Sequence, residues 1–375
     1  MNTMIAQIES LPELIRGQLK ELDARIRNTF THNEILSTKK IFITGCGDSY
    51  FAGLAAKLAL NKWTGLSVEV ASSLPAGRYE LPYSSKSFPS NPLVLGISVS
   101  GGVSRTIEAV NIANEIGART VAITANPESN LASISDKTIN ASVPEFADAP
   151  GVRSYQVSLM VLYLIGLHFA EVNGRMTMQE ADALRDELLA TADVISDTIA
   201  KNKEKAHSLA ESFKSETNFH FVGHGPNLGT AMFSAAKVVE SAGRYANGQD
   251  TEEWAHLEYF NNVTERVPTF VISPGYRGHD LAVNFVSQMN RIGRNIIAVT
   301  PENDLAVAPL ATHHLPVVGE VREELTPFVY MLAGELFAAY VAETSGQKFF
   351  REGDPRYNVE GDHRKTAVVK LKDLD

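Results

Sequence analysis

The feature that most constrains this chain is an internal repeat. The pattern Phe42–Gly47 is echoed by His220–Gly225, and the first glycines of the two patterns lie 178 positions apart. Two further pairs follow in the same order at offsets of 175 and 176, namely Gly96–Ser98 with Val271–Ser273 and Val121–Thr124 with Ile297–Thr300. Three short matches in one order and at nearly one offset indicate two copies of one structural unit.

Each copy begins with the pattern of a strand, a glycine turn and a helix. Ile41–Thr44 is a short apolar run that ends in Gly45–Ser49, and a stretch with helical spacing follows it. The same patterns predict a helix and further strands at Val103–Glu115, Ser67–Ala71, Leu93–Ile97 and Thr120–Thr124. Strands that alternate with helices predict the α/β class, here two tandem, doubly wound, flavodoxin-like parallel sheets with flanking helices.

The repeat divides the chain into five parts. Apolar residues from Ile8 to Leu19 recur at three- and four-residue spacing, which predicts an amphipathic N-terminal helix. A polar, Ala- and Glu-rich stretch predicts a helix that connects the two copies. The predicted order is the N-terminal helix, the first domain, the helical connector, the second domain and a charged tail that closes over the active site, at residues 1–40, 41–172, 173–215, 216–345 and 346–375.

Composition limits the class of protein and its partners. The chain has 375 residues, 44% of them hydrophobic, with a formal net charge of −10 and one cysteine. One cysteine cannot close an intrachain disulfide, and the acidic balance disfavours a nucleic-acid partner because clustered Lys and Arg hold phosphate backbones. The N-terminus lacks the features of a signal peptide, and the longest apolar run, Leu159–Leu167, is shorter than the roughly 20 residues of a membrane helix. We therefore predict a cytoplasmic protein without a membrane partner.

A serine- and glycine-rich turn, Ser98–Ser104, follows a predicted buried strand and opens a predicted helix. Ligands of parallel α/β sheets bind beyond the carboxyl ends of the strands, where a helix N-terminus offers free N–H groups and partial positive charge. Small residues let the backbone approach closely and three hydroxyls add donors, which suits a phosphate monoester. The turn lacks the lysine and the spacing of a nucleotide P-loop. A helix cap without a ligand is an equal alternative, because such residues routinely cap helices.

These patterns together resemble the sugar isomerase (SIS) family. The resemblance rests on Gly45–Ser49, Val68–Ser72, the Ser98–Gly101 turn and the doubled α/β unit, and it runs from about Ile41 to the tail. More narrowly, the chain is similar to the isomerase half of glucosamine-6-phosphate synthase and to stand-alone amino-sugar-phosphate deaminases and fructosamine-6-phosphate deglycases. Each motif is short, so their order and spacing carry the resemblance.

The resemblance implies a phosphate site in the first copy. The family holds phosphate with the serine of a C-G-x-S turn and with the hydroxyls and amides of an S-x-S-G-x-T loop. Carried over to this chain, the phosphate ligands are Ser49, Ser98, Ser100 and the amides of Val99 and Gly101, and Gly47 is a further candidate for substrate binding. Val99 and Val103 stand where the family often has glutamine and threonine, and Ser104 could supply the lost hydroxyl.

Lys237–Glu240, in the second copy, resembles the family's K-x-x-E segment, whose glutamate moves a proton between neighbouring sugar carbons. Aldose–ketose interconversion needs one base that removes a proton beside the carbonyl and returns it to the next carbon, and a carboxylate suits that task. Glu240 is therefore the candidate base, and Lys237 is a candidate for substrate binding. The alternative is a surface ion pair, since the two residues are three apart on a predicted helix.

His256 follows Glu240 by sixteen positions, where the family has a histidine that helps to open the sugar ring. The family's H-G-P is H-L-E in this chain. In the family this histidine reaches the active site of the neighbouring subunit, so the resemblance implies a homodimer with a shared active site. A structural role is the alternative for a single histidine.

The tail resembles the family's closing segment, in which a lysine before S-V-T-V covers the sugar. By position this lysine is Lys365, although six residues of extra spacing loosen the match and a solvated tail is the alternative. Ala149–Ser154 replaces the family's V-A-S-T-K run, where the far end of the substrate is expected to bind. The identity of the sugar is therefore the least constrained part of the prediction.

The expected protein is a phosphosugar isomerase or deaminase, without a cofactor, that acts on an amino-sugar or fructosamine 6-phosphate. No metal is implied, because the adjacent His313 and His314 cannot face one site and no metal-binding motif occurs. Synthesis from glutamine is not expected, because no amidotransferase domain precedes Ile41 and Asn2 rather than cysteine follows Met1. The alternative is a phosphosugar-binding regulator without catalysis, and the spacing of Glu240 and His256 favours chemistry over it.

Overall fold

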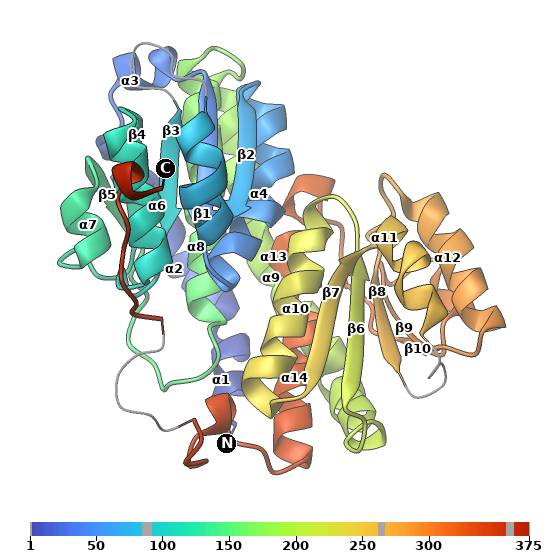
Figure 1. The fold of residues 1–375 in the computed structure, drawn as a ribbon. Coiled ribbons are helices and arrows are strands. Elements are labelled where there is room, and N and C mark those ends of the chain that lie inside the picture. The colour runs from blue at the N-terminus through green and yellow to red at the C-terminus, as the bar shows by residue number, and fades with distance from the viewer. Residues whose placement is uncertain (1, 85–91, 262–266, 358–363, 375) are drawn as a thin grey trace. The chain divides into compact units, whose positions relative to one another are not determined.

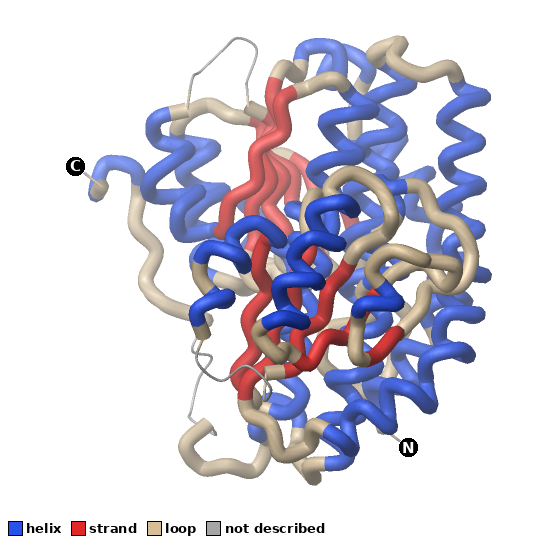
Figure 2. Tube along the Cα trace, turned by 90° about the vertical axis from the view of Figure 1, so that its right-hand side faces the viewer, coloured by secondary structure: helices blue, strands red, loops and turns tan. Residues whose placement is uncertain are grey.

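The computed structural model describes residues 2–84, 92–261, 267–357 and 364–374. Contacts between Cα atoms divide the chain into two units. The first-sheet unit comprises Leu14–Glu145, Arg153–Leu189 and Val359–Asp375, and the second-sheet unit comprises Met1–Glu13, Phe146–Val152 and Ala190–Asn358. In each unit, helices lie against both faces of a parallel sheet (Figures 1 and 2).

The first-sheet unit holds five parallel strands in the order β2-β1-β3-β4-β5. They are β1 (Lys40–Gly45), β2 (Ser67–Ser72), β3 (Leu93–Ile97), β4 (Arg119–Thr124) and β5 (Lys137–Asn140). Every residue of β3 is buried, as expected of a central parallel strand covered on both faces. The accompanying helical elements are α2 (Leu11–Thr29), α3 (His32–Ser37), α4 (Asp48–Thr64), α5 (Ser73–Pro75), a π-turn at Ala76–Glu80, α6 (Ser104–Glu115), α7 (Asn130–Ile134) and α8 (Arg153–Val172).

The second-sheet unit repeats this topology, with the strands in the order β7-β6-β8-β9-β10. They are β6 (Asn218–Gly223), β7 (Tyr245–Asp250), β8 (Pro268–Ile272), β9 (Asn295–Val299) and β10 (His313–His314). Its helices include α1 (Thr3–Glu9), α10 (Pro226–Ala242), α11 (Thr251–His256), α12 (His279–Arg291), α13 (Pro327–Tyr330) and α14 (Leu332–Thr344). The three sequence echoes fall on β1 and β6, β3 and β8, and β4 and β9, so the predicted fold class of two tandem doubly wound units is confirmed.

A shared glycine turn connects the first strand of each sheet to its helix. Gly47 and Gly225 precede α4 and α10 with φ 55° and 56° and ψ −127° in both, a backbone region that favours glycine. A Cβ on Gly45 would lie 2.6 Å from the Ser49 Cβ, and one on Gly223 would lie 2.4 Å from the Asn227 carbonyl oxygen. The repeated glycines therefore follow from the close approach of each helix to its strand end.

The N-terminal segment forms three helices, where the sequence pattern predicted one. α1 ends at a cap on Ser10, and α2 begins at Leu11. α3 begins at a capping box, in which the Thr31 hydroxyl accepts from the Glu34 amide and the Glu34 carboxylate accepts from the Thr31 amide. The apolar spacing therefore predicted helical structure correctly, and the caps at Ser10 and Thr31 set the boundaries between the helices.

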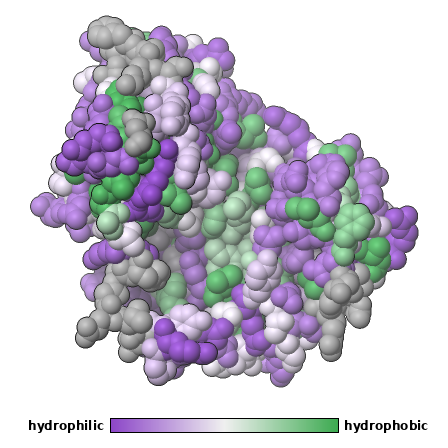
Figure 3. Space-filling model, in the orientation of Figure 1, coloured by the Kyte–Doolittle hydropathy of each residue, from purple (hydrophilic) through white to green (hydrophobic). Residues whose placement is uncertain are grey.

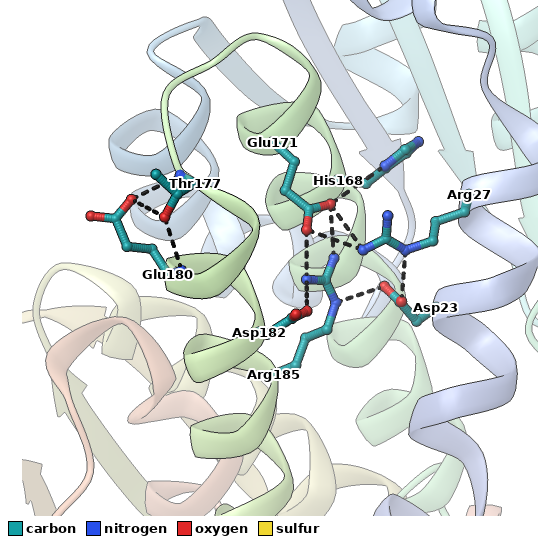
Figure 4. Close-up of polar contacts among 8 residues, drawn as sticks. All are labelled: Asp23, Arg27, His168, Glu171, Thr177, Glu180, Asp182 and Arg185. Carbon is teal, nitrogen blue, oxygen red and sulfur yellow. Dashed lines mark hydrogen bonds and ion pairs between the residues drawn. The ribbon is translucent and has the colours of Figure 1, made fainter.

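An ion-pair network joins α2, α8 and α9 (Met178–Ser212) within the first-sheet unit (Figure 4). The Arg185 guanidinium donates to Asp23 at 3.0 Å and to Glu171 at 2.9 Å, and Arg27 donates to the same two carboxylates. Burial lowers the pKa of His168, whose imidazole lies beside this network. The network ties the start of the predicted connector helix, α9, to the first sheet's helices.

Two helical segments are long and apolar enough to cross a membrane by length and composition alone. They are Arg153–Val172 and Glu323–Thr344, and 89% and 100% of their most apolar windows are buried inside the protein. The expectation that no segment is long enough for a membrane helix rested on the apolar run Leu159–Leu167. This run lies inside the longer helix α8. Such burial is that of core helices, so the two segments are weak evidence for a membrane span.

Candidate active site

The Ser98–Ser104 loop lies at the carboxyl end of β3, as predicted, and β4 and α7 hold its backbone. The Ser98 amide donates to the Ile123 carbonyl at 3.0 Å, and the Val99 carbonyl accepts from the Ala125 amide at 3.0 Å. The Gly101 carbonyl accepts from the Leu131 amide at 3.1 Å. These bonds give the loop a defined shape without a ligand, which is the preorganisation that anion binding needs.

Gly101 is the residue on which this shape depends. Its φ of +62° lies in the left-handed region, and an added Cβ would stand 2.0 Å from the Ser129 Oγ and 2.3 Å from the Ser129 Cβ. Ser129 is itself fixed, because its hydroxyl accepts from the Ala132 amide as the N-cap of α7. No other residue type can occupy position 101 without moving the loop or α7.

The loop presents several hydrogen-bond donors. Ser98 is 3% exposed, and within the described ranges its buried Oγ makes no hydrogen bond. The amides of Val99, Ser100 and Val103 also donate to nothing in the part of the chain that the structure describes. The Gly101 amide, in contrast, donates to the Ser98 carbonyl and shapes the turn. The available donors are thus three amides, the Ser98 hydroxyl and the hydroxyl of Ser100, whose oxygen accepts from the Gly102 amide at 3.3 Å. Such a set is suited to an anion.

Ser49 and Gly47 belong to the same neighbourhood. Ser49 is buried in the first turn of α4, and Gly47 has open space around the position of a Cβ. The Cβ position of Gly45 is close both to the Ser49 Cβ, at 2.6 Å, and to the Ile97 carbonyl oxygen, at 3.0 Å. Ser49 therefore lies beside the end of β3, where the Ser98 loop begins.

The tail returns to this loop. The Ser104 amide donates to the Arg364 carbonyl at 3.2 Å, and the Ser104 hydroxyl accepts from the Thr366 amide at 2.9 Å. Lys365, between these two anchors, has its Cε 3.7 Å from where a Cβ of Gly102 would stand. Within the first-sheet unit the tail runs beside α6 (Figure 1), and it brings the cationic side chain of Lys365 to the serine loop.

The other candidates lie in the second-sheet unit, on α10 and α11. Lys237 is fully buried, and its Nζ donates to Glu240 Oε2 at 2.5 Å and lies 4.8 Å from the centre of the Phe233 ring. The Glu240 side chain is 31% exposed. A buried lysine does not fit the alternative of a surface ion pair, because removing an ammonium group from water is costly. The pair instead presents a half-buried carboxylate, oriented by a buried cation.

His256 is at the end of α11 and its side chain is 67% exposed. Its Nε2 lies 3.2 Å from Glu252 Oε1, one helical turn away. Leu257 and Phe260 follow His256 and are 60% and 76% exposed. Figure 3 shows hydrophilic and hydrophobic side chains mixed on the face of the protein that it draws. His256 is therefore an exposed residue beside exposed apolar side chains, and its role in ring opening stays a prediction.

Sequence reasoning missed four residues that build the loop's surroundings. Ser129 fills the space beside Gly101, the Thr124 hydroxyl donates to the Val99 carbonyl at 3.2 Å, and Arg105 and Glu108 hold the tail. Ser129 before an apolar pair carries an N-cap signal that could have been read. Nothing in the sequence marks the tail contacts of Arg105 and Glu108, because their partners there, Ala367 and Val369, are more than 250 positions away. Across the described ranges no group of three or more His, Cys, Asp and Glu side chains is arranged to hold a metal ion.

Comparison with known proteins agrees with this geometry. Residues 34–167, which contain Ser49 and the serine loop, match the model of the SIS domain. The resemblance to this family is therefore confirmed, and the match covers the first of the two sheets.

Curated relatives extend the similarity over nearly the whole chain. A glutamine–fructose-6-phosphate aminotransferase of Mycolicibacterium paratuberculosis is 28% identical over 352 residues, which cover 92% of this chain and 55% of that protein. One from Thermococcus kodakarensis is 25% identical, over 92% of this chain and 55% of that protein. The chain thus spans about half the length of the curated relatives it matches.

Solved structures confirm that the fold extends beyond the matched SIS domain. The C-terminal domain of glucosamine–fructose-6-phosphate aminotransferase from Francisella tularensis superposes with a TM-score of 0.78 at 19% identity, covering 92% of this chain and 97% of that one. A glucosamine-6-phosphate deaminase from Thermotoga maritima gives 0.62 at 15% identity, covering 92% and 97%. The double SIS-type architecture is therefore shared with these proteins.

Proposed function

We propose that this chain is a cofactor-independent enzyme that isomerises an amino-sugar or fructosamine 6-phosphate by ring opening and proton transfer between carbons 1 and 2. Water then hydrolyses the C=N bond of the resulting imine, which leaves a carbonyl on the sugar and releases ammonia or an amine. The observation that carries the proposal is the serine loop, in which the Ser98 hydroxyl is buried without a partner in the described chain and Lys365 lies over Gly102. Burying a hydroxyl without a hydrogen bond is unfavourable, so a ligand that accepts from it is favoured.

Phosphate is the proposed ligand of this loop. The donors are neutral hydroxyls and amides, and the cationic side chain of Lys365, near Gly102, belongs to the tail. Amides at the start of α6 add the positive end of the helix dipole. In this proposal Ser49, Ser98 and Ser100 bind the phosphate oxygens together with the free amides, and the net charge of −10 does not oppose binding because the attraction is local.

Glu240 is the proposed proton carrier, and the resemblance to the SIS family assigns this role. The neighbouring Lys237 ammonium, 2.5 Å away and fully buried, keeps the carboxylate in one orientation. A positioned carboxylate can take the proton from carbon 2 of the open-chain aldose and deliver it to carbon 1, and in the reverse direction it moves a proton from carbon 1 to carbon 2. His256 is proposed to assist ring opening, with Lys365 neutralising charge near the sugar.

We propose further that the enzyme works as a homodimer. His256, Leu257 and Phe260 are exposed in one short segment of the second-sheet unit. Exposed apolar side chains favour burial against a partner. Light scattering coupled to size exclusion measures the mass, and a monomer at micromolar concentration would contradict the dimer.

The test of the function is replacement of Glu240. With glucosamine 6-phosphate and fructosamine 6-phosphate as substrates, Glu240→Gln should lower kcat by about 10²–10⁴-fold and leave substrate affinity within a few-fold. Release of ammonia or amine measures turnover, and calorimetry measures affinity. The matched control is Glu211→Gln, which breaks a surface Glu–Lys pair at the same three-residue spacing, with Lys214, and should change neither quantity.

The second candidate is a phosphosugar-binding regulator without catalysis. Its support is that the loop's shape is complete without any contribution from Glu240. Tight binding of sugar phosphates, with no turnover of any of them by the unmodified protein, would favour the regulator and reject the enzyme.

A further inference from the structure

The tail segment from Arg364 to Leu374 runs along one side of α6 in the first-sheet unit (Figure 1). Ser104, Glu108 and Glu115 recur at spacings of four and seven on α6, so they lie on one helix face. The Val369 amide donates to Glu108 Oε2 at 2.8 Å, and the Leu371 amide donates to Glu115 Oε2 at 3.0 Å. Leu371 and Leu374 pack against the buried cluster around Phe42 and Ala109. The tail is therefore docked along its length.

Glu108 is the centre of this docking. The residue is fully buried, and its carboxylate accepts from Arg78 Nε at 2.7 Å and Arg78 Nη2 at 3.2 Å, as well as from Val369. Burial would raise the pKa of this carboxyl, but the hydrogen bonds from Arg78 and Val369 and the charge of Arg105 hold it below its ordinary value. The carboxylate therefore stays charged at neutral pH and links the π-turn, α6 and the tail.

Arg105 connects Glu108 to the part of the tail next to Lys365. Its Nη1 donates to Glu108, and its Nη2 donates to the Thr366 hydroxyl at 3.1 Å and to the Ala367 carbonyl. The buried Glu108 carboxylate restricts the Arg105 side chain, so little conformational entropy is lost when Arg105 binds the tail. Its contacts with the tail are therefore preorganised. Thr366 and Ala367 follow Lys365 directly, and Arg364 before it is bonded to Ser104.

We infer that Glu108 is a positioning residue that sets Lys365 over the serine loop, by fixing Arg105 and the backbone of the tail. This inference rests on the proposed function, because Lys365 acts there on the bound sugar phosphate. Neither Glu108 nor Arg105 touches the loop's free donors. Glu108 and Arg105 affect the reaction by holding the tail backbone that positions Lys365.

A double-mutant cycle tests the coupling in the full chain, with glucosamine 6-phosphate as the probe. Glu108→Gln and Arg105→Met should each lower kcat/KM roughly tenfold, since hydrogen bonds to charged groups are the strong ones. In a Lys365→Met background the same two changes should lower it less than about twofold. If Glu108→Gln and Arg105→Met lower kcat/KM by the same factor with and without Lys365→Met, the inference is wrong. Glu21→Gln, which breaks an exposed pair with Arg25 on α2, is the charge-matched control.

Limited trypsin digestion gives a readout that does not require turnover. Cleavage after Lys365, followed by mass spectrometry, should be faster in Glu108→Gln and in Arg105→Met than in the unmodified protein, with an unchanged melting transition. Arg105→Met leaves Glu108 paired with Arg78, so it carries the test if the buried substitution prevents folding. Equal cleavage rates would overturn the inference even if glucosamine 6-phosphate is turned over. Faster cleavage supports it even if the proposed reaction fails.

Discussion

The two sheets share a backbone plan but differ at the ends of their third strands in sequence order, β3 and β8. At β3, the Ser98 hydroxyl is buried without a partner in the described chain, and the following loop keeps three amides free. At β8, the corresponding Ser273 hydroxyl is 2.8 Å from the His279 Nδ1. One strand end is open for a ligand, and its counterpart is closed by the protein's own side chains.

His279 closes the second copy at the position that Ser104 has in the first. Both are the first residues of the helices that follow, and both lie six positions after the strand-end serine. The His279 Nε2 is 3.4 Å from Asp304, and the neighbouring His224 ring lies 3.1 Å from the Thr251 hydroxyl. Burial lowers the pKa of His224. A repeated fold can therefore keep its glycine turn while a few side chains close one of the two strand ends.

The largest expected effect comes from adding one methyl group to the open copy. Gly101→Ala places a Cβ 2.0 Å from the Ser129 Oγ at a φ of +62°, so the loop must move. Because a displacement of about 1 Å can cost a hundredfold, affinity for glucosamine 6-phosphate should fall by at least about that factor. Isothermal titration calorimetry measures the change.

The matched control lies in the closed copy. Gly275 also has a positive φ, of 88°, but its nearest neighbour would be the Pro301 Cγ at 3.7 Å, so Gly275→Ala costs only backbone strain. Its affinity for the sugar phosphate should match that of the unmodified protein. An equal loss in both variants would show that the two strand ends do not differ as described.

Much of this contrast could be predicted from the sequence, because it rests on local patterns. The β1, β3 and β4 strands, the glycine turn and the Ser98 loop each occupy a contiguous stretch whose periodicity and small residues identify it. β10, with two residues, and β7, whose Tyr245–Asp250 segment has no apolar run, carry no such signal. The docking of Thr366 on Arg105 depends on tertiary contact alone. Residues 85–91, 262–266 and 358–363 lie outside the described structure. Whether Glu240 and His256 act in catalysis remains a prediction from the family resemblance.

A second difference should appear in the pH dependence of stability. His220 in β6 corresponds to Phe42 in β1, and burial together with the charge of Arg294 lowers the pKa of His220 from 6.5 to about 4. The unfolded chain therefore takes up a proton first as the pH falls, so stability is full above pH 6.5 and decreases by about 3 kcal/mol on the way to pH 4.

His220→Phe, which copies the residue of the first sheet, should remove this component. Hydrogen exchange of the β6 and β1 segments in urea, followed between pH 7.5 and pH 4, separates the two sheets. The pH dependence of stability attributed to His220 should disappear from the β6 segment, and the β1 segment should show none in either protein. If the stability of the β6 segment keeps the same pH dependence in His220→Phe, a group other than His220 is responsible for it.

The smallest and most discriminating prediction pairs the two strand-end serines. Ser98→Ala removes a donor that has no partner in the described chain, so it should cost no stability and should weaken phosphate-ester binding about tenfold, as loss of a hydrogen bond to a charged group does. Ser273→Ala leaves the Nδ1 of the partly buried His279 ring without its hydroxyl partner, so it should lower stability by about 1 kcal/mol and leave binding unchanged. Calorimetric binding and thermal unfolding of the two variants measure both quantities. Opposite responses of the two serines are expected if one strand end is a site and the other is a closed copy of it, whereas a loss of binding in both would mean that the second sheet also serves the ligand.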